Sequence, residues 1–77
     1  MLNKEQRREG LIKVRSDLAE QFIKLRQEKG WTQLEVAEAI NLCLGMVQKI
    51  EMGKFWSIDT IIYFASFYDK KIVISLV

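Results

Sequence analysis

Residues 30–54 read GWTQLEVAEAINLCLGMVQKIEMGK, and this stretch decides the fold. Its first polar pair, Thr32 and Glu35, forms a capping box: the threonine oxygen accepts from the Glu35 amide while the glutamate side chain reaches back to the cap. The pattern predicts a short helix that begins after Thr32. Its buried face is predicted to consist of Val36, Ala37 and Ile40.

A tight turn and a second short helix complete the stretch. Residues 41–42 are predicted to make the turn, because asparagine tolerates the left-handed backbone conformation better than most residues. The following helix is predicted over residues 44–51, with Val47 and Ile50 facing inward. Gly53 is predicted to end it.

A longer helix is predicted before this stretch. Ser16 has the character of an N-cap, and Gly30 supplies a left-handed stop after about Lys29. Residues 3–14 are predicted to form either an extra helix or a mobile basic arm, because Gly10 weakens a continuous helix by roughly 1 kcal/mol relative to alanine. The core-facing stripe of the longer helix is predicted to contain Leu18, Phe22 and Leu25.

The C-terminal part of the chain is predicted to hold a helix and a strand. The helix begins near Ser57 or Ile58, ends near Tyr68 and is apolar on two faces, so it needs two coverings. Residues 70–77 favour a β-strand because of their β-branched content. A lone strand needs a partner, which is either residues 11–14 or the same strand of a second subunit. We favour the second subunit.

Composition restricts the class of protein. A chain of 77 residues makes one small domain, for which oligomerisation is a source of extra stability. No apolar run approaches the roughly 20 residues of a membrane helix, and the N-terminus lacks the apolar core of a signal peptide, so we expect a cytoplasmic protein without a membrane partner. One cysteine, Cys43, and no histidine allow neither an internal disulfide nor a Cys–His metal site. We expect no metal, no cofactor and no enzyme activity.

The net charge of +2 is unevenly distributed. Residues 1–15 carry five basic and two acidic side chains, whereas the rest of the chain carries seven basic and eight acidic ones. Basic groups neutralise phosphates and release counterions when a protein binds nucleic acid. The N-terminal segment is therefore either a supply of positive charge for such binding or a solvated, charge-rich leader.

The stretch from Gly30 to Lys54 resembles the Cro/repressor-type helix-turn-helix family, also called the xenobiotic-response-element family. The family pattern runs Gly-x-Ser/Thr-Gln-x-x-Leu/Val-Ala-x-x-Ile/Val-Gly and continues into a recognition helix that ends in Ile-Glu-x-Gly-Lys. The resemblance, together with the predicted strand, implies a mainly α, lambda-repressor-like bundle of four to five short helices with a C-terminal β-strand. The matching positions are Gly30, Thr32, Gln33, Val36, Ala37, Ile40, Val47, Ile50, Glu51, Gly53 and Lys54.

The resemblance implies a dimeric transcriptional regulator that binds double-stranded DNA in a sequence-specific way. Its recognition helix, at about residues 44–51, would lie in the major groove. In the family an arginine late in the first helix pairs with the glutamate that closes the recognition helix, and Arg26 and Glu51 stand at these positions. The resemblance implies DNA contacts at Thr32, Gln33, Cys43, Leu44, Gly45, Met46, Gln48, Lys49 and Lys54. For Gln33 it implies either a phosphate contact or stacking on the recognition helix.

The C-terminal residues resemble the antitoxin branch of the family, in which a strand pairs across a two-fold axis and closes the dimer. The chain accordingly divides into an arm or extra helix (1–15), a helix-turn-helix domain (16–69) and a dimerisation strand (70–77). The expected partners are duplex DNA, a second copy and, for an antitoxin, a toxin protein; the sequence does not choose between repressor and antitoxin. The dimer interface is expected at Phe64, Phe67, Ile72, Ile74 and Leu76.

The alternative is a protein-interaction module of the same fold, with weak or lost DNA binding. Leu44 and Gly45 stand where arginine, glutamine or asparagine would read bases most strongly. Apolar side chains on a nominal DNA face suit a protein partner better. Those that favour this alternative are Leu44, Met46, Phe55 and Trp56.

Overall fold

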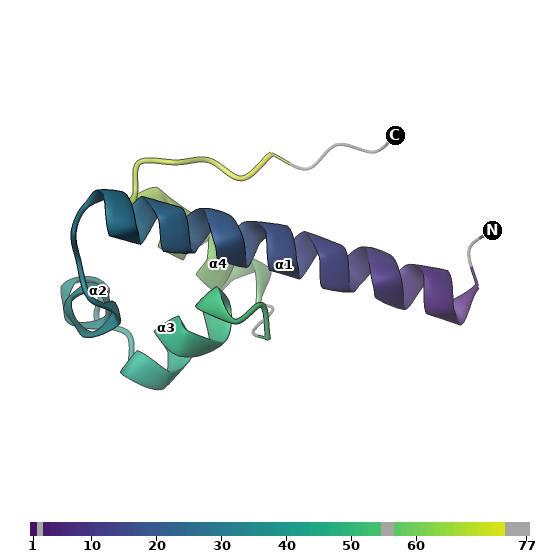
Figure 1. Ribbon diagram of the computed structural model, residues 1–77, viewed down its shortest axis with the longest axis horizontal. Coiled ribbons are helices and arrows are strands. Elements are labelled where there is room, and N and C mark those ends of the chain that lie inside the picture. The colour runs from purple at the N-terminus through teal and green to yellow at the C-terminus, as the bar shows by residue number, and fades with distance from the viewer. Residues whose placement is uncertain (2, 55–56, 74–77) are drawn as a thin grey trace.

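The computed structural model describes Met1, residues 3–54 and residues 57–73, and this part of the chain is mainly helical. Its helices are α1 (Lys4–Glu28), α2 (Gln33–Ile40), α3 (Leu44–Glu51) and α4 (Ile58–Phe67). Figure 1 shows α2, α3 and α4 gathered at the C-terminal half of α1, while the N-terminal half of α1 extends beyond them. No helix of the described residues is long and apolar enough to cross a bilayer.

Helix α1 is one continuous helix that crosses the expected boundary between residues 15 and 16. Asn3 caps it: Asn3 Oδ1 accepts from the Gln6 amide at 2.8 Å, and Gln6 Oε1 accepts from the Asn3 amide at 3.1 Å. The prediction of an N-cap at Ser16 is wrong, because Ser16 is an exposed residue in the middle of α1. The N-terminal residues form helix rather than a mobile arm, and Gly10 does not interrupt it.

Helices α2 and α3 begin and end where the local signals predict. The Thr32–Glu35 capping box closes from both sides, at 3.0 and 3.1 Å. Asn41 adopts the left-handed conformation between the two helices, at φ 58°. Gly30 precedes α2 at φ 71°, and Gly53 follows α3 at φ 70°. Residues that tolerate a positive φ therefore set the three turns around this helix pair.

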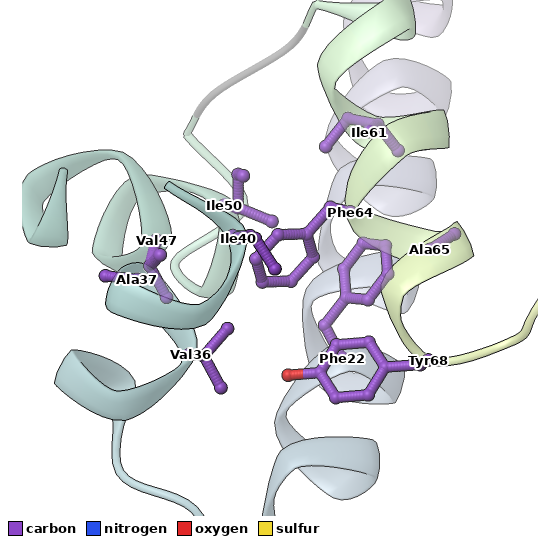
Figure 2. Close-up of a cluster of buried hydrophobic side chains, with 10 residues drawn as sticks. All are labelled: Phe22, Val36, Ala37, Ile40, Val47, Ile50, Ile61, Phe64, Ala65 and Tyr68. Atoms are coloured by element: carbon purple, nitrogen blue, oxygen red, sulfur yellow. The ribbon is translucent and has the colours of Figure 1, made fainter. Parts of the chain in front are cut away.

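One hydrophobic core joins the C-terminal half of α1 to the other three helices. Phe22 of α1 meets Phe64 of α4 edge-on, with 4.8 Å between the ring centroids. Phe64 is in turn edge-on to Tyr68, at 5.7 Å. Figure 2 shows these rings beside the aliphatic side chains of α2 and α3. The buried cluster consists of Phe22, Val36, Ala37, Ile40, Val47, Ile50, Ile61, Phe64, Ala65 and Tyr68.

Helix α4 buries a face that takes residues from both expected apolar stripes, namely Ile61 and Ala65 from one and Phe64 from the other. Ile58 and Ile62, expected in the same stripe as Ile61, are exposed. Phe64 is 0% exposed, so its expected place in a dimer interface is wrong: its whole surface is used in the subunit's own core. Phe67 is half-buried and packs against Trp31, with 5.3 Å between ring centroids. The C-terminal boundary near Tyr68 is as predicted.

The described part of the tail, residues 70–73, runs beside α1 (Figure 1) without forming a strand. A strand needs a partner, and residues 11–14 belong to α1, so pairing within the chain is wrong. Ile72 packs against the core, whereas Val73 is largely exposed. Ile74 and Leu76, expected in the dimer interface, lie outside the described residues.

Candidate functional site

Helix α3 has a buried and an exposed side. Val47 and Ile50 are buried in the core, and the Glu51 side chain is buried beside them. The opposite side carries an exposed stripe that we call the α3 face. A Cβ built at Gly45 of this face meets nothing within 4 Å, so its front is open to an incoming ligand. The α3 face consists of Leu44, Gly45, Gln48, Lys49 and Met52.

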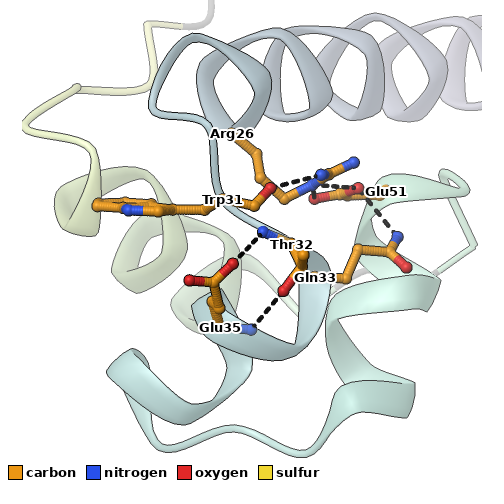
Figure 3. Close-up of polar contacts among 6 residues, drawn as sticks. All are labelled: Arg26, Trp31, Thr32, Gln33, Glu35 and Glu51. Carbon is orange, nitrogen blue, oxygen red and sulfur yellow. Dashed lines mark hydrogen bonds and ion pairs between the residues drawn. The ribbon is translucent and has the colours of Figure 1, made fainter.

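A polar network holds the end of α3 against α1 and the start of α2 (Figure 3). Arg26 Nε lies 2.9 Å from Glu51 Oε2 and 3.1 Å from Oε1, so the ion pair that the resemblance implies is present. Arg26 Nη1 donates to the Trp31 carbonyl at 2.9 Å, and Gln33 Nε2 donates to Glu51 Oε1 at 3.0 Å. The Glu51 side chain is only 2% exposed, and burying a charge to that extent without a partner would be strongly destabilising. The hydrogen bonds from Arg26 and Gln33 offset this cost.

Two hydrogen bonds around this network were not predicted from the sequence. Gln33, expected either to reach a phosphate or to stack on the recognition helix, donates from its amide nitrogen to Glu51 and so joins the start of α2 to the end of α3. Tyr63 of α4 donates its hydroxyl to the Ile40 carbonyl at 3.1 Å and so satisfies the C-terminal end of α2. Both join residues that are distant in the chain, and no local pattern encodes them.

The other expected contact residues divide between the surface and the interior. Cys43 and Lys54, which flank α3, are exposed. The Cys43 side chain makes no capping hydrogen bond, although its backbone is extended as an N-cap requires. The Thr32 hydroxyl is used in its capping box. Met46 is half-buried and packs against the core, so it does not belong to the α3 face.

The charges around α3 are arranged with the cations outside. Lys49 is on the α3 face and Lys54 lies just after the helix, both exposed, whereas Glu51 is buried against Arg26. Burial raises the pKa of Tyr68 to about 12; the Glu51 carboxylate adds to this rise and the Arg26 guanidinium opposes it. The Tyr68 phenol is therefore neutral under ordinary conditions. The charged side chain of the α3 face, Lys49, and that of Lys54 just after the helix are both positive.

A pocket lies on the far side of α1. This open pocket of about 390 Å³ separates α1 from residues 70–73, with Phe22 and Ile72 among its apolar lining and Lys24 and Lys70 among its charged lining. Figure 1 places residues 70–73 on the opposite side of α1 from α2 and α3. The pocket is therefore separate from the α3 face. No group of three His, Cys, Asp or Glu side chains in the described residues could hold a metal ion.

No protein-family model, curated protein or solved structure matches this chain. Its function has to be inferred from the geometry of α2 and α3. That geometry is a short helix with one side buried in the core and the other side exposed, carrying one amide, one cation and two apolar side chains. A buried ion pair fixes its C-terminal end against α1.

Proposed function

We propose that this protein is a lambda-repressor-like helix-turn-helix protein of the Cro/repressor type. It binds double-stranded DNA with α3 in the major groove, as a dimeric transcriptional regulator that is either a repressor or an antitoxin. The observation that carries this proposal is the open α3 face, because the major groove admits one α-helix whose exposed side chains reach the base edges.

The residues of the α3 face suit different parts of the groove. The Gln48 amide can donate and accept at one adenine, and the Lys49 ammonium can donate to guanine acceptors. Leu44 offers an apolar contact to a thymine methyl group, and Gly45 permits close approach of the backbone. Lys54, beyond the end of the helix, is placed for a phosphate contact that positions the protein without reading sequence.

The polar network contributes to this function by fixing α3 rather than by touching DNA. Arg26, Gln33 and Glu51 come from three different helices, so their bonds set the direction in which the α3 face points. A displacement of α3 would misplace Gln48 and Lys49 together. We therefore assign Gln33 a positioning role in place of the direct contact that the resemblance implies.

The test compares two matched double variants. Wild-type protein first selects a duplex from a random-sequence pool, and affinity for that duplex is then measured by fluorescence anisotropy. Gln48→Ala/Lys49→Ala should weaken binding by at least roughly thirtyfold, because two lost base contacts at about 1–3 kcal/mol each sum to about 2–6 kcal/mol. Gln21→Ala/Lys24→Ala removes the same residue types from exposed positions of α1 and should leave affinity unchanged. Equal affinity of both variants would refute the assignment of α3 as the recognition helix.

The dimer part of the proposal rests on the C-terminal residues. A chain without residues 72–77 should be a monomer in sedimentation and should bind DNA far more weakly, because two recognition helices about one DNA turn apart act together. Ile72→Ala is the control, since Ile72 also packs against the subunit's own core. A truncated chain that remains a stable dimer would show that another surface joins the subunits.

One observation favours a second function, a protein-interaction module of the same fold. Leu44 and Met52 place exposed apolar side chains on the α3 face, with Met52 60% exposed. Phe55 and Trp56, which also motivated this alternative, lie outside the described residues. Purification from the native host distinguishes the two: a stoichiometric protein partner without retained DNA favours the module.

A further inference from the structure

The N-terminal half of α1 is a helix without a tertiary neighbour. Every described side chain of residues 3–14 is exposed, and Figure 1 shows this half running past the bundle. It nevertheless begins with a complete capping box at Asn3. We call this extension the α1 arm (residues 4–14). It has no packing contact with the core, and short helices without packing are marginal in water.

The helical repeat places basic residues of the α1 arm on the side that faces the bundle. Residues seven apart lie two turns apart on nearly the same face. Counting back from buried Phe22 leads to Arg15 and then Arg8. Lys4 lies five turns before Phe22 itself, whose ring contacts Phe64 of α4. Lys4 and Arg8, two of the four cations of the arm, therefore lie on the side of α1 that meets the bundle. Arg8 is in line with Arg26, which is five turns further along α1 and reaches Glu51 of α3.

A close contact supports this orientation. A Cβ built at Gly53, directly after α3, would lie 3.3 Å from the Arg15 carbonyl oxygen, so the end of α3 touches α1 where the arm begins. From Arg15 back to Lys4 the helix rises roughly 16 Å, about the length of five base pairs. The arm thus extends beyond the end of α3 over a distance that matters on a duplex.

The other charged residues of the arm lie elsewhere on the helix, with Arg7 in line with Val14 and Gln21. Glu9 and Lys13 are in line with exposed Ser16 and Glu20 on the side away from the bundle. Glu5 lies at the margin between the sides.

Neither the Lys4 nor the Arg8 side chain makes a hydrogen bond or an ion pair with any residue that the structure describes. Two exposed cations one turn apart are therefore available to an anionic partner.

We propose that the α1 arm is a second contact to nucleic acid, in which Lys4 and Arg8 bind the phosphodiester backbone of the duplex whose major groove receives α3. This inference rests on the proposed function and extends its site. Phosphate is favoured as the occupant because the two cationic side chains have no partner among the described residues and lie on the side of α1 that meets the bundle. Such contacts add affinity and salt dependence without reading sequence.

The experiment compares two doubly substituted full-length chains of equal net charge. Lys4→Gln/Arg8→Gln removes two cations from the bundle side of α1, and Lys13→Gln/Lys24→Gln removes two from the other side. Affinity for the selected duplex is measured between about 50 and 200 mM salt, and the slope of log affinity against log salt is compared. We expect the slope of the first variant to fall by about 1.8, or 0.9 for each lost phosphate contact, and that of the second to stay at the wild-type value.

The outcomes separate this inference from the function on which it rests. A wild-type chain that binds no duplex at any salt concentration overturns the proposed function. A chain whose binding requires Gln48 and Lys49, but whose two charge variants have the same slope, overturns the α1 arm alone and leaves an acidic protein segment as the occupant of its basic side. Far-UV circular dichroism establishes that each variant keeps its helices.

Discussion

The two halves of α1 are one helix in two environments. From Arg15 to Glu28 the helix buries Ala19 and Phe22 and supplies Arg26 to the polar network, whereas from Lys4 to Val14 it contributes nothing to the core. Local signals alone, a cap and good helix formers, account for the arm, while tertiary packing accounts for the other half. A single continuous helix can therefore differ in local stability along its length, being stabilised by packing in one half and not in the other.

The largest expected difference between the halves concerns apolar side chains. Phe22→Ala should lower the free energy of unfolding by about 3–5 kcal/mol, because the ring is 3% exposed and packs edge-on against Phe64. Leu11→Ala, in the arm, should cost less than about 1 kcal/mol. Urea unfolding followed by circular dichroism measures both. Similar losses for the two variants would mean that the arm is packed in solution and that the comparison is wrong.

The second prediction concerns arginine in the two halves. Arg26→Ala should cost about 3 kcal/mol, because it leaves the buried Glu51 carboxylate without its ion pair. Arg8→Ala should change stability by less than about 0.5 kcal/mol, since Arg8 is exposed. Arg26→Ala/Glu51→Ala provides the check. A double variant more stable than Arg26→Ala alone would attribute the loss to the unpaired carboxylate, whereas an equally unstable one would attribute it to lost packing.

The helix ends that could be predicted from the sequence are those set by residues next to them in the chain. Helix α3 was predicted with its observed bounds because Asn41 and Gly53 supply turn conformations within the stretch itself. Ser16 was misread as a cap because a serine can equally be an exposed residue of a longer helix, and the Asn3–Gln6 capping box that starts α1 was overlooked. Local signals fix a helix end only when the chain beyond it cannot continue the helix.

The candidate site shows the same division. The Arg26–Glu51 pair was implied by the family resemblance, whereas the Gln33–Glu51 hydrogen bond depends on how α2 and α3 are placed and was not foreseen. Phe64 was expected in a dimer interface because α4 is apolar on two faces, and the periodicity does not indicate which of these residues are buried within the subunit. The choice is made by Phe22, which comes from a distant part of the chain.

The third prediction uses pH to probe the packed half. Tyr68 packs against Phe22, its hydroxyl is buried without a hydrogen-bond partner among the described residues, and its pKa is raised from 10.0 to about 12. Because the folded state holds the proton more tightly than the unfolded state, this stability is present below pH 10 and is lost as pH rises towards 12. Between about pH 9 and 11 the wild type should lose roughly 1 kcal/mol more than Tyr68→Phe.

Stability curves of the two proteins over that pH range, measured by urea unfolding, make the check. Lysine titration affects both chains alike, so only the difference between them reports on Tyr68. At neutral pH Tyr68→Phe should be neutral or slightly stabilising, since it removes a buried hydroxyl without a partner. A pH difference of zero would mean that the Tyr68 phenol is solvated and that the core of the packed half is open at this point.

The smallest expected effect lies in the arm, at Gly10. Gly10→Ala should stabilise the local helix by about 1 kcal/mol, because glycine is a poor helix former and a Cβ at this position meets nothing within 4 Å. If the arm opens independently of the bundle, amide exchange in residues 4–14 should slow by roughly fivefold while the unfolding midpoint barely moves. Gly53→Ala, with φ +70° and the Arg15 carbonyl 3.3 Å from its Cβ, should instead destabilise the whole bundle. If Gly10→Ala raised the free energy of amide exchange in the arm and the free energy of global unfolding by the same amount, the two halves of α1 would unfold as one unit.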